Sequence, residues 1–132
     1  LGYRDYVPAT NKYTVHDDGL RKPWFGCVFV NPPYGSETVK WAGHFAQHSN
    51  GIMLVFSRTD TAWFHALVPE ADLLCFTSGR LSFIRPDGTR GNGPGAGSLF
   101  VAMGEEASAA LEQSGLGLLW TPKRRVAHGV ML

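Results

Sequence analysis

A short apolar strand that runs into two consecutive prolines constrains the fold of this chain more than any other feature. The run Cys27–Val30 is followed directly by Asn31–Gly35, which reads Asn-Pro-Pro-Tyr-Gly. Each proline lacks a backbone N–H and has a fixed φ, so neither a sheet ladder nor a helix continues through the pair. The sequence therefore predicts a rigid extended turn just beyond the carboxyl end of a strand, where open α/β sheets bind ligands.

The turn presents three chemical groups together: the amide of Asn31, the prolyl carbonyls and the aromatic face of Tyr34. A planar base with an exocyclic amine matches this set. The amide oxygen and a carbonyl accept the two N–H bonds of the amine, while the ring stacks on the base. The alternative is a structural turn in which Asn31 caps the backbone and Tyr34 packs on the surface.

Size and composition favour a globular domain. The chain has 132 residues, of which 44% are apolar and 17% charged. These values fit one domain with one core. No apolar run reaches the roughly 20 residues that span a bilayer, and no signal segment opens the sequence. We therefore expect a cytoplasmic protein without a membrane partner.

Basic residues are clustered although the formal net charge is only +1, which is small for a protein that binds nucleic acid. Arg80, Arg85 and Arg90 lie close together in the middle of the chain, and Lys123–Arg125 lies near its end. Local basic patches contact phosphates even when acids elsewhere cancel the total. Charge alone leaves both a DNA-contacting surface and an ordinary surface open.

The cysteines and histidines do not form a pattern typical of a metal site. Cys27 and Cys75 lie in apolar runs, so we expect two buried, reduced thiols rather than a disulfide or zinc ligands. His44 and His48 are four residues apart on an expected helix, but no acidic residue or cysteine completes a ligand set nearby. We predict a solvated helix face there and no metal.

Apolar periodicity and turn residues predict the order of the elements. We expect strands over residues 25–30, 51–56, 71–77, 80–84, 98–102 and 117–120. We expect helices over residues 36–48, from Thr59 or Asp60 to 67, and over 105–113. Ser36 and either Thr59 or Asp60 are the expected N-caps of the first two helices. The first strand, helix and second strand predict a parallel βαβ unit. Trp63 and Phe64 are expected to face the core, and residues 86–97 are expected to form a mobile loop. The whole chain, 1–132, is expected to form a single domain, with a loop-rich opening over residues 1–24 and a tail over residues 121–132.

Three blocks of the sequence resemble the phage-type, Dam-like DNA adenine-N6 methyltransferase family. They are Val7–Gly35, which contains the proline turn, Arg58–His65 and Gly79–Phe83. The resemblance covers residues 7–103. It implies an α/β fold with a Rossmann-like methyltransferase core, in which helices flank a mixed, mostly parallel sheet. It also implies methyl transfer from S-adenosylmethionine to the exocyclic amine of adenine in double-stranded DNA, in a bacterial host, by a phage or prophage protein.

The resemblance assigns the chemistry to the proline turn. Asn31, Pro32, Pro33 and Tyr34 match the residues that hold the target base in this family. The Asn31 amide and the Pro32 carbonyl are expected to accept hydrogen bonds from the amine, which points its lone pair at the methyl carbon. Tyr34 is expected to stack on a base flipped out of the duplex.

The same resemblance suggests contacts with the cofactor and with DNA. The cofactor-binding candidates are Asp17, Asp18 and Asn31. Asp17 or Asp18 matches the place of an acid near the adenosine, although a plain turn explains the two acids equally well. The DNA-binding candidates are Arg58, Asp60, Arg80 and Arg85. Arg58 and Asp60 either contact phosphate or order the site, and Arg80 serves either target recognition or an internal ion pair. Residues 86–97 are a candidate DNA-facing segment.

The sequence departs from the family at its start. Only six residues precede Val7, and they contain neither a strand followed by an acid nor a glycine-rich motif that binds the cofactor. The glycines between Gly91 and Gly97 lie between expected antiparallel strands, which is the wrong context for a nucleotide fingerprint. The core can thus be incomplete at its N-terminus, the cofactor can be held differently, or the chain can be a catalytically silent relative that binds nucleic acid or protein. Methylation of a different planar nitrogen also stays open.

Overall fold

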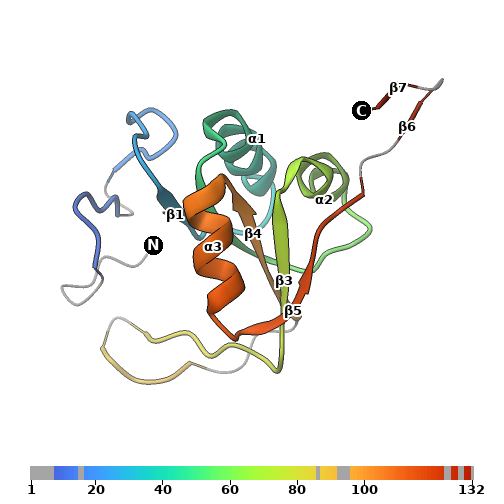
Figure 1. Ribbon diagram of the computed structural model, residues 1–132. Helices are drawn as coiled ribbons and strands as arrows, with labels where there is room; N and C mark the ends of the chain where they lie inside the picture. The colour runs from blue at the N-terminus through green and yellow to red at the C-terminus, as the bar shows by residue number, and fades with distance from the viewer. Residues whose placement is uncertain are drawn as a thin grey trace.

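The computed structural model describes residues 8–14, 17–85, 87–91, 96–123, 126–127 and 130–131 (Figure 1). It shows a mixed α/β fold in which helices cover both faces of a five-stranded sheet. The elements in chain order are β1 (Val28–Val30), α1 (Thr38–His48), β2 (Gly51–Phe56), α2 (Ala62–Leu67), a 3₁₀ turn (Val68–Glu70), β3 (Leu73–Thr77), β4 (Ser98–Met103), α3 (Glu105–Gln113), β5 (Gly117–Trp120) and a separate short pair, β6 (Val126–Ala127) with β7 (Val130–Met131). The expected bounds of β2, α3 and β5 are confirmed.

The sheet has the order β1-β2-β4-β3-β5, and only β1 and β2 pair in parallel. The pairs β2–β4, β3–β4 and β3–β5 are antiparallel. The prediction of a mostly parallel sheet is therefore wrong, whereas a mixed sheet flanked by helices and a parallel β1–α1–β2 unit are confirmed. The cause is β4: it follows β3 with no helix among the described residues between them, returns antiparallel to it, and inserts between β2 and β3. A Rossmann-like core stays a prediction.

Strand direction explains the positions of the helices. β2 and β3 both run against β4, so β1, β2 and β3 all point the same way, whereas β4 and β5 point the opposite way. α1 and α2 connect strands of the first direction and pack on one face of the sheet. α3 connects strands of the second direction and packs on the other face (Figure 1). Opposite faces are what a common handedness of the three crossovers requires.

The core has two halves, one on each face of the sheet. Met53 and Val55 of β2 pack with Phe45 of α1 in the first half. Leu54 of β2 packs with Leu111 of α3 in the second half, because successive strand residues point to opposite faces. Burying each such side chain stabilises the fold by about 1.5–3 kcal/mol. The prediction that α2 turns its aromatic residues toward the core is confirmed, since Phe64 is buried and Trp63 packs against the same cluster.

The strand expected over residues 80–84 is absent from the described structure, and this prediction is wrong. The segment forms a single isolated bridge, between Ile84 and Arg90. Both edges of β4 are already occupied, by β2 and by β3, so the segment has no strand to join there. Leu81 and Phe83 instead pack against the α3 half of the core. In the loop that follows, residues 86 and 92–95 lie outside the described residues, as do residues 124–125, 128–129 and 132 of the expected tail.

The two cysteines differ in their surroundings. Cys75 is buried as expected, but Cys27 is exposed, so the prediction of two buried thiols is half wrong. Cys27 comes directly before β1, which is an edge strand. No described helix covers the outer face of this strand, where Phe29 is 62% exposed.

The helix caps also differ from the prediction. The N-cap of α1 is Glu37, not Ser36, and it makes no side-chain cap bond. The N-cap of α2 is Thr61, whose hydroxyl oxygen accepts a hydrogen bond from the Phe64 N–H. Thr59 and Asp60 lie in the turn before it. Both helices therefore begin one or two residues later than the sequence suggested, after the chain has left the sheet edge.

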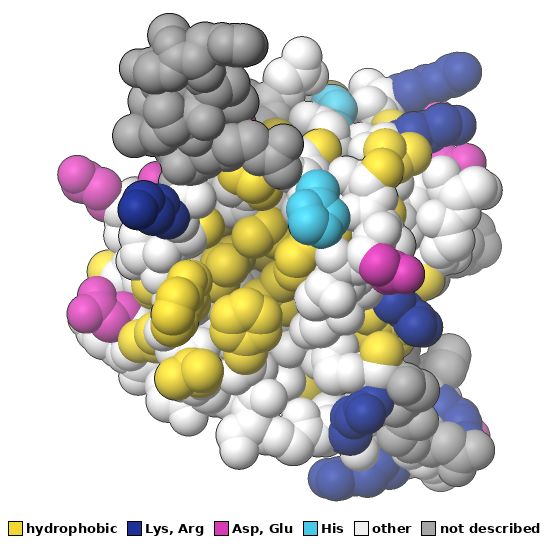
Figure 2. All heavy atoms as spheres, turned by 90° about the vertical axis from the view of Figure 1, so that its right-hand side faces the viewer, with side chains coloured by type: hydrophobic (Ala, Val, Ile, Leu, Met, Phe, Trp, Pro, Cys, Tyr) yellow, Lys and Arg dark blue, Asp and Glu magenta, His cyan; other side chains and the backbone are white. Residues whose placement is uncertain are grey.

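The opposite edge of the sheet carries an apolar surface. β5 is the last strand, and its Leu118 and Trp120 are 65% and 59% exposed. Figure 2 shows the side of the molecule on the right of Figure 1, where β5 and α2 lie, and apolar side chains gather at its centre. No helix in the described ranges is long and apolar enough to cross a membrane.

Candidate functional site

The sequence-predicted site residues converge on one edge of the sheet. Because β1, β2 and β3 point the same way, their carboxyl ends lie at the same edge. The chain leaves this edge through three segments, which are Asn31–Gly35, Ser57–Thr61 and Ser78–Arg80. These segments contain the proline turn and three of the four DNA-binding candidates, and this edge is where α/β sheets bind ligands.

β2 extends beyond β1 at this edge and supports the proline turn. Val30, the last residue of β1, lies opposite Met53, so the last three residues of β2, Leu54–Phe56, run alongside the turn. This overhang explains why Tyr34 contacts both Leu54 and Phe56.

The turn is anchored to α1. Pro32 is fully buried, and the hydroxyl of Thr38, itself 2% exposed, donates a hydrogen bond of 3.0 Å to the Pro33 carbonyl. The Thr38 N–H donates to the carbonyl of Gly35, whose φ of +113° favours glycine. The first residue of α1 therefore holds the turn at two points.

The ring of Tyr34 lies against the carboxyl end of β2. It stacks on Phe56 with the ring centres 4.0 Å apart and an angle of 15° between the planes. Its hydroxyl lies 3.4 Å from Asn31 Oδ1 and 3.4 Å from the Leu54 carbonyl oxygen. Burial raises the pKa of Tyr34 to about 12, so the hydroxyl stays protonated at neutral pH and acts as a donor. With 39% of the residue exposed, Tyr34 remains accessible to a ligand.

The two prolyl carbonyls are not equivalent. The Pro33 carbonyl accepts the Thr38 hydroxyl. Within the described residues, no donor bonds the Pro32 carbonyl. Half-buried Asn31 adds an amide oxygen whose one contact, the Tyr34 hydroxyl, leaves a second lone pair for another donor. The turn therefore offers two acceptors next to an aromatic ring, which suits a planar ligand with an amino group.

The DNA-binding candidates occupy different parts of this side of the molecule. Arg58 and Asp60 are exposed in the turn after β2, and the Arg58 guanidinium carbon lies 5.8 Å from the centre of the Phe56 ring. Exposed Arg80 follows β3 at the same edge. Exposed Arg85 lies farther along the loop, where its guanidinium donates to the Arg90 carbonyl at 3.1 Å.

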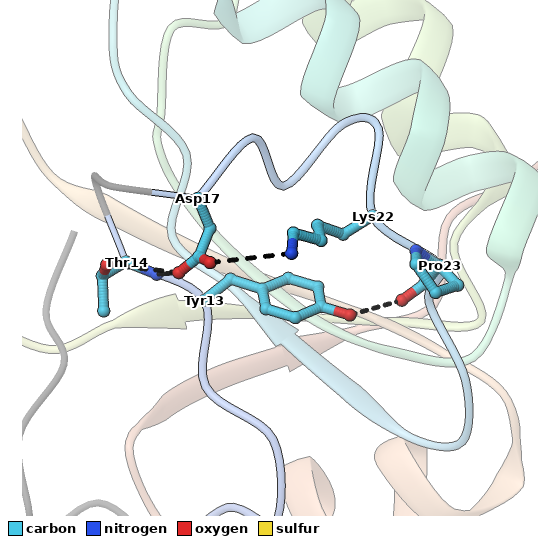
Figure 3. A network of polar contacts seen from close by, with 5 residues as sticks. All are labelled: Tyr13, Thr14, Asp17, Lys22 and Pro23. Carbon is cyan, nitrogen blue, oxygen red and sulfur yellow. Dashed lines mark hydrogen bonds and ion pairs between the residues drawn. The ribbon is translucent and has the colours of Figure 1, made fainter.

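The acids suggested as cofactor contacts are engaged within the segment before β1. Figure 3 shows the Asp17 carboxylate accepting from the Thr14 N–H at 2.8 Å and lying 3.9 Å from Lys22 Nζ. Asp18 pairs with Arg21 at 3.3 Å. These contacts stabilise the segment before β1, as expected if the two acids belong to a plain turn. A cofactor-binding role of either acid stays a prediction.

A second hollow lies near the amino end of β1, away from this edge. It is a pocket of about 390 Å³ whose lining includes Arg21, Trp24, His44 and His48. The two histidines pack edge-on to Trp24, at 4.2 and 5.9 Å between ring centres, rather than facing solvent freely. His48 Nε2 also lies 2.7 Å from the Gly26 carbonyl oxygen. The described residues contain no group of three or more metal-binding side chains.

Comparison with known families shows which family the chain belongs to. A family model described as DNA N-6-adenine-methyltransferase (Dam) matches residues 5–111. The chain belongs to this family. The Dam family match covers the whole candidate site, from the braced acids to the loop after β3. It supports a role in adenine-N6 methylation of DNA in general terms, with DNA as the substrate. No curated protein and no solved structure matches the chain.

Two residues of the candidate site were missed by sequence reasoning. Thr38 anchors the turn from the first residue of α1, and Phe56 stacks on Tyr34 from the last residue of β2. A signal for Thr38 was available, since a threonine five residues after a carbonyl that lacks a neighbouring N–H is well placed to donate to it. The sequence held no comparable signal for Phe56, because its position is that of an ordinary apolar residue in a buried strand.

Proposed function

We propose that this chain is an S-adenosylmethionine-dependent methyltransferase that modifies the exocyclic amine of adenine in double-stranded DNA. One observation carries the proposal: the Asn31 amide, the Pro32 carbonyl and the accessible Tyr34 ring lie together at the ligand-binding edge of the sheet, and no donor among the described residues bonds that carbonyl. The Dam family match supports it independently.

The acceptors of the turn orient the amine. Asn31 Oδ1 and the Pro32 carbonyl each accept one N–H of the adenine amine, so the nitrogen lone pair points away from both of them. Tyr34 stacks on the base after it has been flipped from the duplex. Holding the nitrogen in this geometry supplies much of the acceleration, because it replaces a random encounter with a prepared attack.

S-adenosylmethionine supplies an electrophilic methyl group on a sulfonium sulfur. The turn would hold the amine nitrogen where it could bond to that methyl group as the sulfonium sulfur leaves as a thioether, and one amine proton would then pass to solvent. Tyr34 does not take this proton, since a hydroxyl with a pKa of about 12 stays protonated at neutral pH. Its role is to stack and to hold the Asn31 amide in place.

The residues of the proline turn suit binding of the target amine better than Asp17 and Asp18 suit binding of the cofactor's adenosine. Asn31 stands where the amine would meet the methyl group. Asp17 and Asp18 remain the proposed contacts to the cofactor, although each already has a protein partner that a ligand would have to share or replace. Arg58, Arg80 and Arg85 are the proposed contacts to DNA phosphates, and Asp60 orders the turn beside Arg58.

The test is transfer of labelled methyl groups from S-adenosylmethionine to unmethylated duplex DNA. We expect label in the N6 position of adenine, loss of label with Tyr34→Ala, and retention with Tyr13→Ala. Tyr13 is a matched control, because it is about as exposed as Tyr34 but lies before β1 and bonds the Pro23 carbonyl. Equal loss in both variants contradicts a special role of the turn.

The second candidate is a silent relative that binds nucleic acid without catalysis. Asp17 and Asp18 already contact Thr14 and Arg21, which favours a relative whose acids serve the fold rather than a cofactor. A folded protein that binds duplex DNA, does not bind S-adenosylmethionine and transfers no label establishes this alternative. Label in cytosine or in protein instead of adenine establishes the reading in which the turn accepts a different planar nitrogen.

A further inference from the structure

We propose that Phe56 is a positioning residue that fixes the Tyr34 ring, so that the target base stacks on one face of it only. The inference rests on the proposed function for the identity of the base. It concerns a residue outside the proline turn that touches neither the amine nor the methyl group.

The stack leaves a single face of Tyr34 for a ligand. Phe56 lies against one face, with 4.0 Å between ring centres and nearly parallel planes. A third ring cannot enter between two rings at this spacing, since aromatic stacking already places them in contact. Because Tyr34 is still 39% exposed, the opposite face or the edge is accessible. A flipped base therefore approaches from the side away from Phe56.

The same contact fixes the height of the ring relative to the amide. The Tyr34 hydroxyl has one proton and two acceptors at 3.4 Å, namely Asn31 Oδ1 and the Leu54 carbonyl. Leu54 and Phe56 are alternate residues of β2, so one strand holds both the hydroxyl and the ring face. A ring without Phe56 behind it would tilt away from β2 and carry its hydroxyl away from Asn31.

Arg58 extends this arrangement toward the DNA side. Its N–H donates to the Phe56 carbonyl at 2.8 Å, and its guanidinium carbon lies 5.8 Å from the Phe56 ring centre. A cation over an aromatic ring is attracted by the ring quadrupole. Phe56 thus links the residue that stacks on the base to an exposed cation suited to a phosphate.

The experiment compares Phe56→Leu and Phe56→Tyr with Phe76→Leu. Phe76 is a matched control, because it is also a half-buried phenylalanine near the carboxyl end of a strand, β3, that runs in the same direction as β2. It differs in packing on the α1/α2 half of the core. The first readout is spectrophotometric titration of Tyr34, isolated as the difference from the same protein with Tyr34→Phe. The second is kcat/KM for methyl transfer to duplex DNA.

We expect Phe56→Leu to lower the pKa of Tyr34 from about 12 toward its ordinary value, since the hydroxyl becomes more hydrated. We expect kcat/KM to fall roughly two- to twelve-fold, the range for loss of one aromatic pair. Phe56→Tyr restores both, and Phe76→Leu changes neither. A loss of stability alone would not move the Tyr34 titration of the folded protein.

The outcomes separate this inference from the proposed function. An active wild-type protein whose Tyr34 titration and kcat/KM are unchanged by Phe56→Leu overturns the positioning role and leaves the function standing. An inactive wild-type protein in which Phe56→Leu still shifts the Tyr34 titration, and Phe56→Tyr restores it, supports the positioning of the ring and overturns the function.

Discussion

Two segments that leave the same sheet edge are built in opposite ways. The proline turn after β1 is anchored at every step, by the burial of Pro32, by the bonds from Thr38 and by the stack of Tyr34 on Phe56. In the described part of the segment after β3, an isolated bridge between Ile84 and Arg90 and a few local backbone hydrogen bonds hold the loop, and its arginines are exposed. The first suits chemistry that depends on the placement of a few atoms, and the second suits contact with a surface that varies along its length.

This difference separates two kinds of recognition in one site. Phosphate contacts orient nucleic acid without demanding fixed geometry, whereas a reacting amine must be held to within a fraction of an ångström. We therefore expect substitutions in the turn to change the rate of transfer or the stability of the fold. Substitutions after β3 should change the salt dependence of DNA binding.

The largest expected effect is on the turn. Asn31→Ala removes one of the two acceptors for the amine, and we expect the rate of methyl transfer to fall by about 10²-fold or more. The affinity for S-adenosylmethionine should change far less. Single-turnover kinetics and calorimetric titration of the cofactor measure the two quantities. Equal losses in rate and cofactor affinity would show that Asn31 is a structural residue of the turn.

Stability should also separate the two segments. Thr38→Val removes the buried donor to the Pro33 carbonyl at nearly constant volume. We expect a loss of about 1–3 kcal/mol in the free energy of unfolding, since a shielded carbonyl is left without its partner. Thr89→Val in the loop after β3 removes an exposed hydroxyl bonded to Asp87, and should cost within about 0.5 kcal/mol. Denaturant unfolding of both variants measures the difference, and equal costs would remove the contrast between the segments.

The features that could be predicted from the sequence depend on contacts between residues close together in the chain. The turn, the βαβ unit and the ligand-binding edge follow from local features, because two prolines after an apolar strand permit few alternatives. The insertion of β4 between β2 and β3 did not follow, since strand order depends on pairing between residues far apart in the chain. With both edges of β4 paired in this way, residues 80–84 do not form the expected strand, and Leu81 and Phe83 pack against the α3 half of the core.

The candidate site shows the same limit at finer scale. Asn31, Pro32 and Tyr34 are neighbours in the sequence, so their proximity was predictable. The contact of Tyr34 with Phe56 joins the turn after β1 to the end of β2. It depends on how far β2 extends beyond β1, which the register of the two strands sets. The cap of α2 is Thr61 rather than Thr59 or Asp60, because three neighbouring polar residues can all cap and only tertiary position decides among them.

Salt dependence should report on the exposed arginines. Arg80→Gln and Arg85→Gln are each expected to reduce the slope of log affinity against log salt by about 0.9, the value for one lost phosphate contact. Arg21→Gln is the control, since Arg21 is exposed but lines the pocket near the amino end of β1. Fluorescence anisotropy with labelled duplex DNA measures the slopes. A slope that changes only with Arg21→Gln would place the DNA at the other end of the sheet.

The smallest expected effect concerns the hydroxyl of Tyr34. Burial raises its pKa to about 12, above the ordinary value of 10.0, so the folded state favours the protonated form. The resulting contribution to stability is complete below pH 10 and is lost as pH rises from about 10 toward 12. The loss should be small, because 39% of Tyr34 is exposed and solvent screens the effect.

Tyr34→Phe should remove this part of the alkaline loss of stability while retaining the ring that stacks on the base. Tyr13→Phe should leave it in place, since Tyr13 bonds the Pro23 carbonyl far from the turn in sequence. Urea unfolding between about pH 9 and 12 separates the two variants. An alkaline loss that is the same in Tyr34→Phe as in wild type would show that the hydroxyl is as hydrated as in the unfolded chain, and would weaken its assignment as the donor that holds Asn31.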